Sequence, residues 1–109
     1  MKIEEGEVMS KTLLQNYIEL AQEGTKESIG DIMAALNENT TIVDTKYIDF
    51  ALGHVSGEEG MKVMEEYLFK GTKSQRNYAT LFFARLGEYL IIRKAYDLGL
   101  IDARQAFSR

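Results

Sequence analysis

The stretch from Thr72 to Leu98 constrains the fold more than any other part of the chain. It begins with a Thr-x-x-Gln capping box, formed by Thr72 and Gln75, and it is followed by Gly99, a residue type that commonly ends helices. No proline interrupts it, because the chain has none. The sequence therefore predicts one long central helix over residues 72–98, whose apolar side chains the rest of the chain must cover.

Apolar residues recur at helical spacing in the rest of the chain as well. Each run is bounded by capping residues or by glycine, and no segment repeats at a fixed period. The expected helices outside the central one cover residues 11–23, 25–36, 45–52, 57–70 and 103–107. The predicted fold is all-α: a compact helical bundle of about five to six helices around the long central helix (72–98).

Residues 40–52 allow two interpretations. The β-branched Ile42 and Val43 suit a strand, whereas Tyr47, Ile48 and Ala51 repeat at helical spacing. A single strand has no evident partner in this chain. We therefore expect a short helix over residues 45–52, capped by Asp44 or Thr45.

The length of 109 residues fits a single helical domain, residues 1–109, in which residues 1–9 show no periodicity and form a flexible arm. The acidic start lacks the basic and apolar regions of a secretory signal. The most apolar window, residues 78–92, is about 15 residues long, shorter than the roughly 20 residues of a membrane span. We expect a cytoplasmic protein with no membrane segment.

Few residues suit catalysis or metal binding. The chain has no cysteine, which excludes disulfides, thiolate metal sites and a cysteine nucleophile. His54 is the single histidine, so a site with several histidine ligands cannot form. The sequence predicts no catalytic residue, no cofactor and no metal site, and this favours a function other than catalysis.

The charge is unevenly distributed. Residues 1–54 contain 4 basic and 10 acidic residues, whereas residues 55–109 contain 9 and 7, and the net charge is −4. Binding to nucleic acid depends largely on basic residues that meet phosphates. The net charge therefore argues against a general nucleic-acid binder, and the asymmetry suits a partner that docks on one face.

A projection of the central helix at 100° per residue aligns tyrosines and arginines on one line. Tyrosine and arginine are enriched among residues that dominate protein interfaces. The stripe has three interpretations: the rim of the core, with its arginines paired to carboxylates; a protein interface, most simply that of a symmetric homodimer; or a surface for nucleic acid. The predicted interaction surface consists of Tyr78, Arg85, Tyr89, Arg93 and Tyr96.

These observations predict a small cytoplasmic protein–protein interaction or regulatory module that self-associates, most simply as a dimer, or binds another protein. One alternative is a nucleic-acid-associated regulator that uses a basic face in the C-terminal half. The residues of that face would be Lys70, Lys73, Arg76, Arg93, Lys94 and Arg104. A second alternative is a small-ligand-binding protein or enzyme with a Tyr/Arg pocket.

Overall fold

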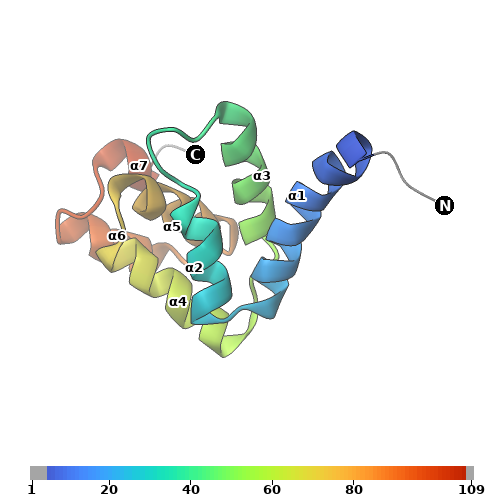
Figure 1. The fold of residues 1–109 in the computed structure, drawn as a ribbon. Helices are drawn as coiled ribbons and strands as arrows, with labels where there is room; N and C mark the ends of the chain where they lie inside the picture. The colour runs from blue at the N-terminus through green and yellow to red at the C-terminus, as the bar shows by residue number, and fades with distance from the viewer. Residues whose placement is uncertain (1–4, 108–109) are drawn as a thin grey trace. The chain divides into compact units, whose positions relative to one another are not determined.

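All regular secondary structure between residues 5 and 107 is α-helical. A computed structural model describes this part of the chain, and describes residues 5–12 by their backbone alone. The all-α fold class is confirmed. The helices are α1 (Glu5–Glu23), α2 (Lys26–Ala34), α3 (Ile42–Leu52), α4 (Gly57–Lys70), α5 (Lys73–Arg85), α6 (Tyr89–Asp97) and α7 (Ala103–Phe107) (Figure 1).

Side-chain caps fix where several helices begin. The predicted capping box at α5 is present: the backbone N–H of Gln75 donates to Thr72 Oγ1 (3.2 Å), and Thr72 N–H donates to Gln75 Oε1 (2.9 Å). Asp102 and Gln105 form the same reciprocal pair at α7, with distances of 2.8 and 2.9 Å. Each box satisfies backbone N–H groups that have no partner inside the helix.

The predicted continuous helix over residues 72–98 is wrong, because the chain turns at Gly87. This glycine has a φ of 74°, a left-handed conformation that side chains disfavour. Its N–H donates to Ala84 O (3.0 Å), and the N–H of Glu88 donates to Phe83 O (2.9 Å). These two bonds form a Schellman motif, which ends α5 and separates it from α6. The expected central helix is therefore two helices.

The predicted helix end at Gly99 is confirmed, and this end also forms a Schellman motif. Gly99 has a φ of 76°, and its N–H donates to Tyr96 O at 2.9 Å. The N–H of Leu100 donates to Ala95 O at 3.0 Å, which completes a second Schellman motif.

Two further helix starts differ from the sequence prediction. α1 begins at Glu5, so residues 5–9 are helical where an irregular arm was expected, and residues 1–4 of that arm lie outside the described residues. No stop signal separates residues 5–9 from Lys11, which explains the earlier start. The helical interpretation of residues 40–52 is confirmed, but α3 begins at Ile42 because Thr41 caps it by accepting from Asp44 N–H (3.1 Å).

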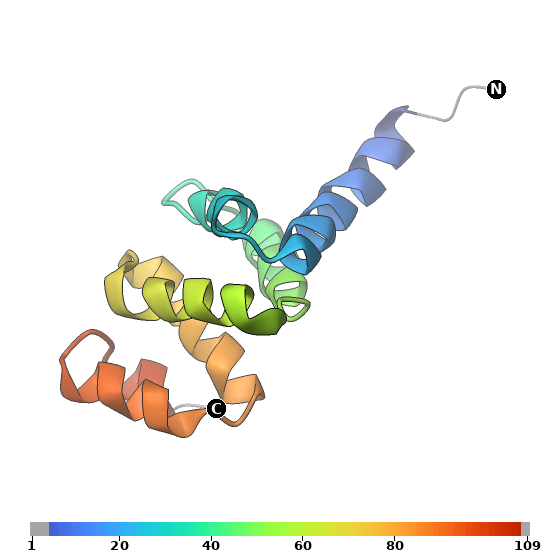
Figure 2. The same cartoon turned by 90° about the horizontal axis from the view of Figure 1, so that it is seen from below.

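The chain divides into two compact units, residues 1–60 and residues 61–109. In the first unit, α1 packs against both α2 and α3 (Figure 1). In the second, α5, α6 and α7 contact one another, and α6 and α7 lie side by side (Figure 2). Each unit has its own set of buried side chains, and the single-domain organisation stays a prediction.

The buried side chains are almost all apolar, as expected for amphipathic helices. Those of the first unit are Ala21, Ile29, Ile32, Met33, Leu36, Ile48, Ala51, Leu52 and Val55. Those of the second unit are Val63, Met64, Leu68, Ala79, Phe82, Phe83, Ala84, Ile92, Ala95, Ile101 and Ala106.

The helices recur along the chain at a nearly constant interval. One series consists of α2, α4 and α6, which begin at Lys26, Gly57 and Tyr89. The other consists of α3, α5 and α7, which begin at Ile42, Lys73 and Ala103. Successive helices of either series differ in their starting position by almost the same number of residues. We call this spacing the helix-pair repeat; a fixed period of helix pairs is typical of repeat architectures.

Caps and buried positions follow the helix-pair repeat as well. The residues Thr41, Thr72 and Asp102 each precede a helix of the second series and accept a bond from the N–H three residues later. Buried positions also match between α3 and α5. Ile48, Ala51 and Leu52 of α3 correspond to Ala79, Phe82 and Phe83 of α5.

Replacing Gly87 with alanine tests the helix break. No atom lies within 4 Å of an added Cβ, so the substitution acts through the backbone alone. A left-handed alanine costs about 1 kcal/mol, and we expect the free energy of unfolding in urea to fall by that amount. If residues 72–98 formed one helix, the same change would stabilise the protein by about 1 kcal/mol, because alanine favours helix interiors. The control Gly87→Asn should lose less, since asparagine tolerates left-handed geometry.

The packing of α1 on α3 predicts a pH dependence. Burial, and after it the negative charge of Asp44, raises the pKa of the Tyr17 phenol. A folded-state pKa above the unfolded value of about 10 means that the stabilisation is complete below pH 10 and is lost as the pH rises through the folded pKa. We expect wild-type stability in urea to fall more steeply above pH 10 than that of Tyr17→Phe. Parallel stability curves for the two proteins would contradict this assignment.

Candidate interaction surface

The turn at Gly87 divides the predicted tyrosine and arginine stripe between two helices. Tyr78 and Arg85 lie on α5, whereas Tyr89, Arg93 and Tyr96 lie on α6. The five side chains would align only if they belonged to one helix. The prediction of one continuous stripe is therefore wrong. The three residues of α6 are spaced by four and three positions and still share one side of that helix.

The surroundings of these residues differ. Tyr78 is half-buried and Arg85 is exposed. Arg93 is exposed and its Nε donates to Asp97 Oδ1 at 3.0 Å, a pairing of exposed groups one helical turn apart. Tyr96 is half-buried, and its ring meets Phe107 edge to face at 5.0 Å between centroids. Tyr96 is therefore held by packing with α7, whereas Tyr89 and Arg93 remain accessible.

An exposed side of α6 carries Tyr89, Leu90 and Arg93, which we call the α6 face. At 100° per residue these side chains fall within a 100° arc. Leu90 is 88% exposed and Tyr89 is 59% exposed. A different side of the helix carries the buried Ile92 and Ala95. Folding the second unit therefore buries one side of α6 and leaves an aromatic and an aliphatic side chain beside a cation on the other.

A second exposed apolar surface lies on α3 and was missed by the sequence prediction. It carries Ile42, Val43, Lys46 and Phe50, which we call the α3 face, and these residues also fall within a 100° arc. Ile42 is 76% exposed and Phe50 is 59% exposed. His54 lies beside Phe50, with their ring centroids 5.2 Å apart. The β-branched Ile42 and Val43 are the sequence signal for this surface, but the same residues also suit a strand.

The helix-pair repeat shows that the apolar residues of the α6 face are not a general feature of its series. The second residue of α2 is Glu27, that of α4 is Glu58 and that of α6 is Leu90, and all three are exposed. A glutamate in the first turn complements the positive end of the helix dipole. Leu90 therefore stands where the other two helices carry a stabilising acid.

The same comparison applies to the α3 face. α3 begins with Ile42 and Val43, whereas α5 begins with Lys73-Ser74 and α7 with Ala103-Arg104. All six residues are exposed. Aligning the chain with itself at the spacing of the helix-pair repeat would have singled out the apolar starts of α3 and α6, because the equivalent helix starts carry small, polar or charged residues instead.

Half of the residues of the predicted basic face have contacts inside the second unit. Arg76 Nη1 donates to Gly71 O at 2.7 Å and thus ties the joint between α4 and α5. Lys94 Nζ lies 5.7 Å from the centroid of the Phe69 ring, a cation–π contact, and Arg93 pairs with Asp97. Lys70, Lys73 and Arg104 are exposed, on three different helices.

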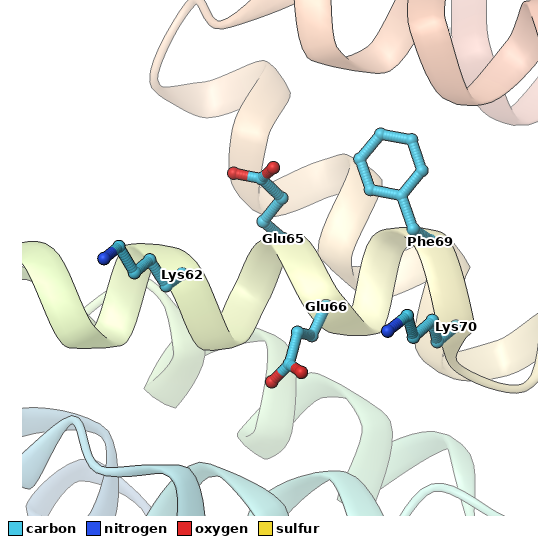
Figure 3. Close-up of a pocket in the computed structure, with 5 residues that line it drawn as sticks. All are labelled: Lys62, Glu65, Glu66, Phe69 and Lys70. Atoms are coloured by element: carbon cyan, nitrogen blue, oxygen red, sulfur yellow. The ribbon is translucent and has the colours of Figure 1, made fainter.

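A pocket of about 620 Å³ lies along α4 (Figure 3). The residues that line it are Lys62, Glu65, Glu66, Phe69 and Lys70. Glu65 and Phe69 project to one side of the helix and Glu66 to another (Figure 3). Binding pockets usually bring polar groups together from several elements, whereas these five come from one helix and carry balanced charges. The tyrosines and arginines of the predicted Tyr/Arg pocket are not among them.

Neither a metal cluster nor a membrane span is found in the part of the chain that the structure describes. Within residues 5–107 no group of three or more histidine, aspartate or glutamate side chains is placed to hold a metal ion. In the same range no helix combines the length and the apolarity that crossing a membrane requires.

Comparison of the chain with protein families, with curated proteins and with solved structures finds no match. The assignment of a function therefore depends on the two faces and their chemistry.

Substitutions on the α6 face should leave folding intact. We expect Leu90→Glu and Tyr89→Ser to change the free energy of unfolding by less than about 0.5 kcal/mol, because exposed positions contribute little. The substitution Ile92→Ala, at a buried position of the same helix, should cost about 2 to 5 kcal/mol. Urea denaturation monitored by circular dichroism measures all three. A loss comparable to that of Ile92→Ala at either exposed position would show that the chain itself covers the α6 face.

Proposed function

We propose that this chain is a small cytoplasmic protein–protein interaction or regulatory module that self-associates through the α6 face. The observation that carries the proposal is the exposure of Tyr89 and Leu90 next to Arg93 on a helix whose other side is buried. Aromatic and arginine side chains dominate many interfaces because they bury a large area. Leu90 adds an aliphatic side chain that remains exposed to water in the folded chain.

The proposed surface is narrower than the one expected from sequence. Tyr96 packs against Phe107, and Tyr78 and Arg85 belong to α5, so they support or flank the surface. The proposal thus relies on Tyr89, Leu90 and Arg93, with Asp97 orienting the guanidinium of Arg93.

The two alternative functions have less support. A nucleic-acid surface needs several available cations on one side, whereas Arg76 and Lys94 each have a contact inside the unit and Lys70, Lys73 and Arg104 lie on three different helices. A ligand-binding or catalytic site needs groups that converge on one pocket, and the tyrosines and arginines of the stripe lie outside the pocket along α4.

Light scattering coupled to size-exclusion chromatography tests self-association. We expect the wild type to exceed its monomer mass of 12.4 kDa at high micromolar concentration and to dissociate on dilution. The double variant Tyr89→Ala/Arg93→Ala should weaken the dissociation constant by at least about tenfold, because it removes both anchor types. The control Lys73→Ala changes an exposed cation of α5 and should behave as the wild type. A wild type that stays monomeric at every concentration would contradict the proposed function.

A further inference from the structure

The α3 face and the α6 face have similar compositions. Both are exposed arcs with two or three large apolar side chains and one cation. The first two residues of α3 and of α6, which belong to these faces, stand where the equivalent helices of the helix-pair repeat carry small, polar or charged residues. The repeat itself therefore does not require apolar side chains at the starts of α3 and α6. Two such surfaces in one chain suggest a contact in which each covers the other.

The charges favour pairing of unlike faces. The first unit contains 4 basic and 12 acidic residues, a net charge of −8, whereas the second contains 9 and 5, a net charge of +4. The helices follow the same trend: α3 carries Asp44 and Asp49 against Lys46, and α6 carries Arg93 and Lys94 against Asp97. Two second units brought together would oppose like net charges, and so would two first units, which disfavours either arrangement.

We propose that the α6 face of one copy docks on the α3 face of a second copy, and that the second copy returns the same contact. This proposal rests on the self-association proposed above and names the surface that the α6 face meets. A two-fold axis makes the contact twice, since residue i meets residue j and residue j meets residue i. Doubling a small contact brings the buried area closer to that of a specific interface than one contact alone can.

Two substitutions with opposite charge test the contact. Leu90→Glu places an acid on the α6 face, opposite the acidic first unit, and Phe50→Lys places a base on the α3 face, opposite the basic second unit. We expect each variant alone to weaken self-association at least tenfold, measured by light scattering and analytical ultracentrifugation. Circular dichroism and thermal unfolding should match the wild type, because both positions are exposed.

Mixing the two variants is the decisive experiment. In the mixed dimer one contact is formed by two unaltered faces, and the other pairs the new glutamate with the new lysine. We expect the mixture to associate within about threefold of the wild-type dissociation constant, although neither variant associates alone. The matched controls Ser74→Glu and Ser74→Lys make the same substitutions on α5, at the position that corresponds to Val43, and should leave association unchanged.

The outcomes separate the two proposals. If Leu90→Glu disrupts association and Phe50→Lys does not, the α6 face meets another surface, which overturns this inference and leaves the proposed function in place. If the mixture fails to associate, the pairing of unlike faces is also overturned. A mass that continues to grow with concentration would overturn the closed dimer. If the wild type does not associate, the proposed function itself fails.

Discussion

The left-handed backbone at Gly87 is the constraint on which the second unit depends. A continuous helix over residues 72–98 would place Phe82 and Ile92 on one axis, at opposite ends of about 15 Å of helix. The Schellman motif at Gly87 instead starts a new axis at Tyr89, so that α5, α6 and α7 contact one another and both Phe82 and Ile92 are buried. The same turn leaves Leu86, Tyr89 and Leu90 exposed around the junction.

The all-α class and most helices could be predicted because their determinants are local. Thr72 with Gln75, Asp102 with Gln105, and Gly99 act within four positions along the chain, so their spacing in the sequence is enough. Gly87 carried the same signal as Gly99, since each follows a leucine at a helix end. It was interpreted as part of a longer helix because the apolar pattern continues past it. Periodicity does not distinguish one amphipathic helix from two that bury their faces in the same core.

The exposed faces of α3 and α6 were harder to predict than the fold. Tyr89 and Arg93 are four residues apart on one helix, so their spacing predicts that they share a face. Tyr78 was expected on the same face only if residues 72–98 formed one helix, and they form two. The α3 face was missed because Ile42 and Val43 suit a buried strand, and only the cap at Thr41 shows that they begin a helix. Whether a side chain is exposed depends on contacts between segments that are distant in sequence. The hydrophobic pattern of one segment contains no information about those contacts. The helix-pair repeat supplies part of that missing information. Comparing the residues at equivalent positions of successive helices shows which residue types the packing of a helix pair requires.

The energetics of small apolar faces favour a reciprocal contact over a single one. Burying a large apolar side chain contributes about 1.5 to 3 kcal/mol, so one contact between Leu90, Tyr89, Ile42 and Phe50 offers roughly 6 to 12 kcal/mol. Association costs a comparable free energy in lost freedom of motion, which leaves a single contact marginal. A second copy of the contact roughly doubles the favourable contribution, whereas the loss of overall translation and rotation occurs once. In the proposed symmetric dimer, each copy would therefore contribute both faces, and the two contacts together would offset a cost of association that one contact only balances.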